Sequence, residues 1–133
     1  MAFDDRFRLS SHAVITDDEG KVLLLKASYG NHHWGLPGGA LEPGETIHQA
    51  LERECLEELG QEVQIQYLSG VYYHGAYESQ AFIFRVTLSS PNIILSSEHS
   101  DYGFFEIDGL SAVQQRRVRE CLNFNGKVVS AAF

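Results

Sequence analysis

Residues 46–59 carry the clearest local structural signal in the sequence. Thr46 is followed three residues later by Gln49, the arrangement of a capping box, and neither Gly nor Pro occurs until Gly60. Apolar side chains recur along one side of this segment, at Ile47, Leu51 and Cys55. The sequence therefore predicts a helix over residues 46–59 that ends at Gly60 and docks its apolar side on a sheet.

The residues before this helix predict strands and a loop. Residues 7–16 and 21–27 are rich in β-branched and apolar residues, and a turn at residues 17–20 separates them, so we expect a hairpin. Residues 28–44 are rich in Gly and Pro, and the expected structure is mostly loop around a short extended segment.

The residues after the helix predict further strands of a mixed sheet. Two runs of β formers cover residues 62–77 and 80–88, with Gly70 and Gly75 as expected bulges or bends in the first. A polar loop is expected next, followed by a short strand and a second helix, at residues 89–101, 104–107 and 111–122. With 133 residues, 44% of them hydrophobic, we expect a single domain over residues 1–133 in the α/β (α+β) class.

The charge distribution limits the partners of the chain. The net charge is −8, and residues 42–62 hold seven glutamates against one basic residue, Arg53. Nucleic-acid polymers are bound chiefly by clustered Lys and Arg, so we expect no such partner. The acidic stretch is either a solvated helix face or a cation site.

Neither the N-terminal residues nor the cysteines suggest export. The opening residues have no apolar run before their charges, and no segment approaches the ~20 apolar residues needed to cross a bilayer. Cys55 and Cys121 form no CxxC pair and no disulfide pattern. We therefore expect a cytoplasmic location and no membrane partner.

Three glutamates of the helix, Glu54, Glu57 and Glu58, stand at i, i+3 and i+4, so their carboxylates share one face. By spacing alone, a solvated surface face is the more common explanation. Two features favour a cation site instead: the apolar stripe lies alongside, and Gly38-Gly39 lies just upstream. Two successive glycines let a backbone carbonyl approach a cation closely, and oxygen ligands suit Mg²⁺.

The residues from Gly39 to Gln61 resemble the Nudix box. Gly39 is followed by Glu45 and then by Arg53-Glu54-Cys55-Leu56-Glu57-Glu58-Leu59-Gly60, which fills every charged and Gly position of that pattern. The sequence departs at two apolar positions, Cys55 and Gln61. The resemblance implies a Nudix-type α/β/α sandwich with a mixed β-sheet.

The resemblance also implies roles for the residues of the box. The metal ligands fall on Glu57, Glu58 and the Gly38 carbonyl, and Glu54 is a further ligand or the base that activates water. Arg53 and Glu45 form an ion pair of structural importance. The cofactor is Mg²⁺ or Mn²⁺.

Candidates outside the box carry weaker signals. Many members of the family take another ligand or base from a loop opposite the helix, which points to Glu98. The alternative is a solvent-exposed glutamate, with His99 and Asp101 competing for the role. Trp34 and Tyr77 are candidates for stacking on a nucleobase, although aromatic residues in strands are more often part of the core.

The expected function is that of a Nudix pyrophosphohydrolase acting on phosphoanhydride bonds. We expect a metal-dependent hydrolase of a diphosphate linkage in a nucleoside triphosphate or another nucleoside diphosphate derivative. One alternative is a dinucleoside polyphosphate hydrolase, because Tyr77 lies 17 residues beyond Gly60, a spacing seen in such members. Another is a non-catalytic ligand-sensing module. The expected partner is a small nucleotide-like substrate, and a homodimer is left open.

Overall fold

The structure is a computed structural model that describes residues 3–133. Within these residues, two helices and eight strands follow one another: β1 (Arg8–Val14), β2 (Val22–Ala27), β3 (Trp34–Gly35), β4 (Gly38–Ala40), α1 (Ile47–Leu59), β5 (Val63–His74), β6 (Ser79–Leu88), β7 (His99–Phe105), α2 (Ala112–Leu122) and β8 (Val129–Ala132). A short 3-10 turn, Ile107–Gly109, precedes α2. No helix in residues 3–133 is long and apolar enough to cross a membrane.

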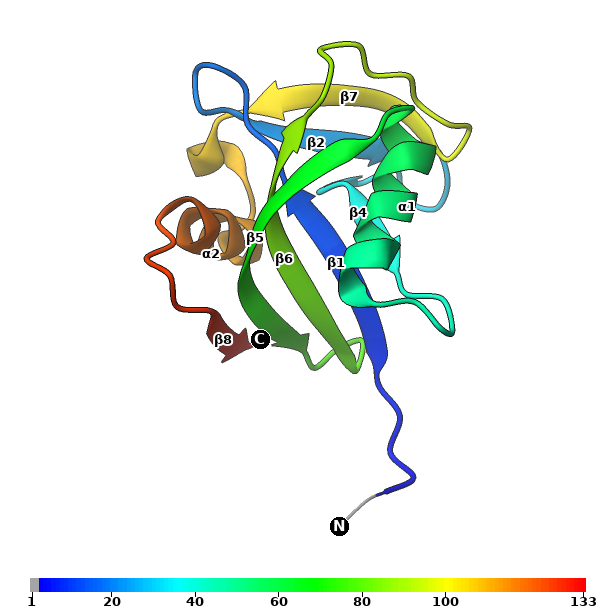
Figure 1. The fold of residues 1–133 in the computed structure, drawn as a ribbon, viewed down its shortest axis with the longest axis vertical. Helices are drawn as coiled ribbons and strands as arrows, with labels where there is room; N and C mark the ends of the chain where they lie inside the picture. The colour runs from blue at the N-terminus through cyan, green and yellow to red at the C-terminus, as the bar shows by residue number, and fades with distance from the viewer. Residues whose placement is uncertain (1–2) are drawn as a thin grey trace.

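The strands form two sheets. The larger is mixed, in the order β4-β1-β6-β5-β8, with β1 parallel to β6 and β5 parallel to β8. The smaller is antiparallel, in the order β3-β2-β7. Helices α1 and α2 lie on opposite sides of the larger sheet (Figure 1). The expected α/β/α sandwich with a mixed sheet is confirmed.

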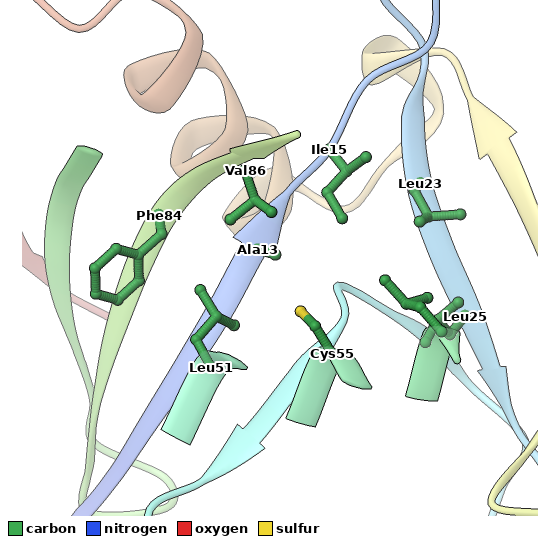
Figure 2. Close-up of a cluster of buried hydrophobic side chains, with 9 residues drawn as sticks. Ala13, Ile15, Leu23, Leu25, Leu51, Cys55, Phe84 and Val86 are labelled. Carbon is green, nitrogen blue, oxygen red and sulfur yellow. The ribbon is translucent and has the colours of Figure 1, made fainter. Parts of the chain in front are cut away.

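Two buried clusters fill the space between the sheets and the helices. Because side chains of a strand alternate between its faces, Ala13 and Ile15 join one cluster while Val14 joins the other. The first cluster, drawn in Figure 2, meets α1 through Leu51, Cys55 and Leu59. The second meets α2 through Val118 and Cys121. Burial on both faces explains why β2 and β6 are apolar over consecutive residues.

The best-signalled helix forms as its sequence predicts. Thr46 caps α1 by accepting a hydrogen bond from the Gln49 backbone N–H, and the Gln49 side chain returns the bond to the Thr46 backbone. Gly60 ends the helix in the left-handed conformation, with φ 71°. Strand β5 also shows the expected irregularity, a register shift between Leu68 and Gly70.

The predicted hairpin of residues 7–16 with 21–27 is wrong. β1 pairs with β4 and β6, whereas β2 pairs with β3 and β7. Only an isolated bridge between Thr16 and Val22 joins the two strands near their turn. Asp17 stabilises that turn by accepting hydrogen bonds from the backbone N–H groups of Glu19 and Lys21. Turn chemistry of this kind is local, so it does not determine which neighbours the two strands take further along.

Two other strand predictions need correction. β7 begins at His99, within the stretch predicted as a polar loop, because residues 99–101 pair with the end of β2. Ser100 and Asp101 are exposed there, which removes the apolar signal. β8 is a short edge strand beside β5 that was not predicted, and it has no buried side chain.

The C-terminal end of α1 generates a prediction on stability. An added Cβ at Gly60 would lie 2.9 Å from the Ile94 Cβ, whereas one at Gly20, with φ 79°, meets nothing within 4 Å. Gly20→Ala therefore measures only the cost of the left-handed backbone, about 1–2 kcal/mol. Gly60→Ala should lose a further ~1–3 kcal/mol from overpacking. Urea unfolding measures both; equal losses would contradict the close approach of Ile94.

Candidate active site

Strand β4 and helix α1 meet at Gly38 and Glu58. The Gly38 backbone N–H lies 3.2 Å from each carboxylate oxygen of Glu58, whose side chain is buried, with 2% exposed. Gly38 has φ 136°, and an added Cβ would lie 2.1 Å from the Ser11 carbonyl oxygen. Only glycine fits this position, so the close packing of β4 on β1 places the backbone beside Glu58.

Glu54 occupies the neighbouring position. An added Cβ at Gly39 would lie 2.8–2.9 Å from the carboxylate atoms of Glu54, so the second glycine makes room for this side chain. The Glu54 side chain is 15% exposed and accepts a 2.9 Å hydrogen bond from Arg53 Nη1. The Gly-Gly segment and the two carboxylates therefore form one compact group.

No cationic side chain within the described chain pairs with Glu58 to stabilise its ionised form. Burial is the main cause that raises its pKa well above the usual range, against the opposing Gly38 N–H, and the charges of Glu54 and Glu98 raise it further. No ion pair formed by residues 3–133 includes Glu58. A buried carboxylate without a cation is costly, and two carboxylates beside glycine carbonyls are oxygen donors of the kind that bind hard divalent cations.

Arg53 ties the helix to the preceding loop. Its Nε and Nη2 atoms lie 2.6 and 2.9 Å from the two oxygens of Glu45, a bidentate pair. Nη2 also donates to the Ala40 carbonyl at 3.2 Å. The hydrogen bond from Arg53 lowers the pKa of Glu45 well below its usual range. One guanidinium thus connects the loop, the helix and Glu54.

Glu57 is far more exposed than the other two glutamates. Its side chain is 57% exposed, and its Oε2 is 3.5 Å from Arg53 Nη1. Across residues 3–133, no three His, Cys, Asp or Glu side chains gather closely enough to hold a metal ion. The structure thus brings Glu54 and Glu58 together at Gly38-Gly39 and leaves Glu57 beside the guanidinium.

Glu98 lies in the turn just before β7 and is exposed. Its charge is one of the causes that raise the pKa of Glu58, so it lies within electrostatic range of that carboxylate. The neighbouring His99 is half-buried, and its Nδ1 has no hydrogen-bond partner. Burial lowers the pKa of His99, against the opposing charges of Glu98 and Glu54. His99 is therefore a second polar group on this side of the site.

A pocket of about 710 Å³ extends from Gly38 and His99 to helix α2. Trp34 and Tyr77 both line it. Trp34 packs edge-to-face on Phe105, with ring centroids 5.0 Å apart, and Tyr77 is 70% exposed. Three polar pocket residues that sequence reasoning missed are His12, His74 and Arg117. One signal pointed to Arg117: it falls midway between Val113 and Cys121, at the spacing of an apolar helix stripe.

Comparison with known proteins gives the family. The model of the NUDIX domain matches residues 6–122, so the chain belongs to the Nudix family. RNA pyrophosphohydrolase of Serratia proteamaculans is 43% identical over 60 residues, which are 45% of this chain and 34% of that protein. The chain thus spans about a third of the length of the curated relatives it matches.

Solved structures agree with this assignment. An ADP-ribose pyrophosphatase from Streptococcus suis superposes with a TM-score of 0.77 at 20% identity, covering 96% of this chain and 100% of that one. The Ap4A hydrolase of C. elegans gives a TM-score of 0.70 at 27% identity, covering 85% and 93% of the two chains. The first likeness shows the fold alone.

The buried charge of Glu58 generates a prediction on pH dependence. Because its pKa is raised in the folded chain, folded Glu58 keeps a proton that the unfolded chain loses near the ordinary value of 4.5. This contribution to stability is complete below that pH and is lost as pH rises towards the folded pKa. In excess chelator, Glu58→Gln should therefore gain stability relative to the unmodified chain between pH 4.5 and pH 8, by ~1.4 kcal/mol or more.

Chemical denaturation at several pH values measures this difference. Glu52→Gln, an exposed position on the same helix, is the control and should show no such trend. A stability difference for Glu58→Gln that stays constant with pH would contradict the raised pKa.

Proposed function

We propose that this chain is a metal-dependent pyrophosphohydrolase that cuts a diphosphate linkage in a small nucleotide derivative. The observation that carries the proposal is the buried Glu58 beside Glu54, against Gly38-Gly39, with no cationic side chain among residues 3–133 paired to it. Nudix hydrolases generally use divalent metals, and the oxygen donors present here suit Mg²⁺ or Mn²⁺.

The residues of the Nudix box have different proposed roles. Glu57, Glu58 and the Gly38 carbonyl would hold the metal, with Glu54 as a further ligand or as the base. When bound, the metal neutralises phosphate oxygens and lowers the pKa of water. Glu57 is exposed and contacts Arg53 at 3.5 Å, so its side chain is free to turn towards Glu54 and Glu58 without unpacking the core.

Glu54 is suited to accept the proton of the attacking water. Arg53 fixes its orientation through the 2.9 Å hydrogen bond, and Gly39 leaves space in front of the carboxylate. Water attacks one phosphorus atom, its proton passes to Glu54, and the bond from that phosphorus to the bridging oxygen breaks. Two phosphorylated products leave.

The substrate proposed first is a nucleoside triphosphate or another nucleoside diphosphate derivative. The pocket supports it, because Trp34 and Tyr77 offer aromatic surface for a base in the pocket that Gly38 also lines. A dinucleoside polyphosphate is the second candidate. Tyr77 lines the pocket at the spacing seen in hydrolases of such substrates, and the Ap4A hydrolase of C. elegans is a structural neighbour.

RNA is a third substrate class to test. Curated relatives are named RNA pyrophosphohydrolases, whereas the net charge of −8 opposes binding of a polymer backbone. A panel of nucleoside triphosphates, nucleotide sugars, dinucleoside polyphosphates and 5′-triphosphorylated RNA, assayed with Mg²⁺ and read by product identity, separates the classes. Binding without turnover of any of them would favour a ligand-sensing module.

The cysteines support a reducing, cytoplasmic setting as part of the proposal. Cys55 and Cys121 are both free and buried, and burial raises the pKa of both thiols. Neither is therefore poised to form a disulfide.

Activity should require the divalent metal and Glu54. Excess chelator should abolish turnover. Glu54→Gln should lower kcat a hundredfold or more, on the order of general-base effects, with little change in Tm. Glu52→Gln, exposed on the same helix, should leave kcat unchanged. Steady-state kinetics measure these effects, and a near-normal rate for Glu54→Gln would exclude the role given to Glu54.

Glu98 should contribute from the opposite side. Its charge acts on Glu58 from the turn before β7, so Glu98→Ala should lower turnover at least tenfold, at the low end of acid–base effects, and weaken the metal dependence. Asp101→Ala tests the competing acidic residue nearby and should have little effect. If Asp101→Ala lowers turnover at least tenfold and Glu98→Ala has little effect, the ligand or base is Asp101 rather than Glu98.

A further inference from the structure

The wall of the pocket differs in charge from the rest of the protein. The chain carries a net charge of −8, yet no Asp or Glu is among the residues of 3–133 that line this pocket. The lining instead includes two arginines and four histidines: Arg8, Arg117, His12, His33, His74 and His99. The absence of carboxylates from the described lining of this pocket, in a protein that is acidic as a whole, favours an anionic occupant.

Arg117 is the buried centre of this basic wall. It projects from α2, and only 8% of the residue is exposed. Its Nε and Nη2 atoms donate to the Gln114 side-chain oxygen, and Nη1 lies 3.2 Å from His74 Nε2. None of the ion pairs found in the described chain includes Arg117. Its charge is therefore held in place by neutral partners.

The two nearest histidines add no charge of their own. Burial, and then the charge of Arg117, lower the pKa of His74, and the same causes lower that of His12 further. A neutral His74 that accepts from Arg117 at Nε2 carries its proton on Nδ1. Arg117 is therefore the buried positive charge at this end of the pocket, and burial lowers the pKa even of its guanidinium, to about 10.

A buried guanidinium without a carboxylate weakens the folded state. An apolar side chain would fill the same stripe position between Val113 and Cys121 without that cost. The planar fork of arginine matches oxyanions in both geometry and charge. A stability cost at a pocket wall, with a neutral amide and imidazole fixing the fork, is typical of a binding group rather than a packing group.

We propose that Arg117, positioned by Gln114 and His74, binds an oxyanion of the ligand, a phosphate or a carboxylate, at the α2 end of the pocket. Identifying this group as the part of the substrate remote from the scissile diphosphate rests on the proposed function. The pocket joins the two ends, since both Gly38 and Arg117 line it. The preferred substrates then carry a second anionic group beyond the diphosphate.

Thermal unfolding in excess chelator tests the subsite without turnover. Inorganic phosphate is titrated against chloride at matched ionic strength, with Arg117→Gln and Arg119→Gln as a pair. Arg119 lies on the same helix, is 44% exposed and pairs with Asp108, so the two variants remove the same charge from different sites. Non-specific stabilisation by phosphate acts on all three proteins alike, whereas binding adds a saturable gain in Tm.

The expected result is a saturable phosphate effect in the unmodified chain and in Arg119→Gln, with an apparent Kd at least tenfold higher in Arg117→Gln. Acetate in place of phosphate distinguishes a carboxylate from a phosphate ligand. Equal phosphate effects in all three proteins would overturn the proposal. Without phosphate, Arg117→Gln should melt no lower than the unmodified chain, and a large fall in Tm would make Arg117 a structural residue instead.

If Arg117→Gln does not fold, phosphate binding can still be measured directly on the unmodified chain. Phosphate titrated into the unmodified, isotope-labelled chain should shift the ring nitrogen signals of His74 saturably, while those of His48, which lies outside the pocket on α1, stay in place. Unshifted His74 signals would refute the subsite.

Kinetics separate this proposal from the proposed function. For a substrate with a second phosphate remote from the scissile linkage, Arg117→Gln should raise KM at least tenfold with little change in kcat. For a substrate without that group, the two proteins should have the same KM. If the unmodified chain hydrolyses nothing yet binds phosphate through Arg117, the function fails and the subsite stands. If the unmodified chain hydrolyses the substrate and Arg117→Gln changes neither KM nor phosphate binding, the function stands and the subsite fails.

Discussion

The burial of one carboxylate, that of Glu58, governs the local structure of this protein. Helix α1 docks through Leu51, Cys55 and Leu59, and Glu58 lies on the same stripe, seven residues after Leu51. The packing that builds the core therefore also carries this carboxyl group out of water and raises its pKa. The Gly38 N–H, which only a glycine can place there, offsets part of the cost. The same packing of α1 on the sheet therefore stabilises the fold and positions the proposed metal site.

Arg53 explains how such an acidic segment remains folded. Seven glutamates within residues 42–62 repel one another, and a single guanidinium contacts Glu45, Glu54 and Glu57. Its bidentate bond to Glu45 fixes the loop that leads into α1, and its other arm orients Glu54. Because the Arg53 and Glu45 side chains are only 23% and 16% exposed, solvent screens this pair less than an ordinary surface ion pair. Loop geometry and the orientation of the proposed base therefore depend on the same side chain.

The sequence predicts well those structural features that depend on residues close together in the chain. The capping box and Gly60 define α1 because their hydrogen bonds span only a few residues. Strand partners are decided by distant residues, so a turn at Asp17 could not show that β1 and β2 belong to different sheets. In the site, the spacing of Glu54, Glu57 and Glu58 places them on one face, but their burial differs. That difference follows from the position of Glu58 on the apolar stripe of the helix, seven residues after Leu51.

A second ionisable residue stands on the apolar stripe of a helix, and this one is basic. Arg117 stands on the stripe of α2 between Val113 and Cys121, just as Glu58 stands on that of α1. The two helices lie on opposite sides of the larger sheet (Figure 1), and each buries one ionisable side chain that no ion pair of residues 3–133 includes. One pocket runs from Gly38, beside Glu58, to Arg117. Stability is thus given up at both ends of a single cavity, and a ligand with a metal-bound diphosphate and a second anion would compensate both charges together.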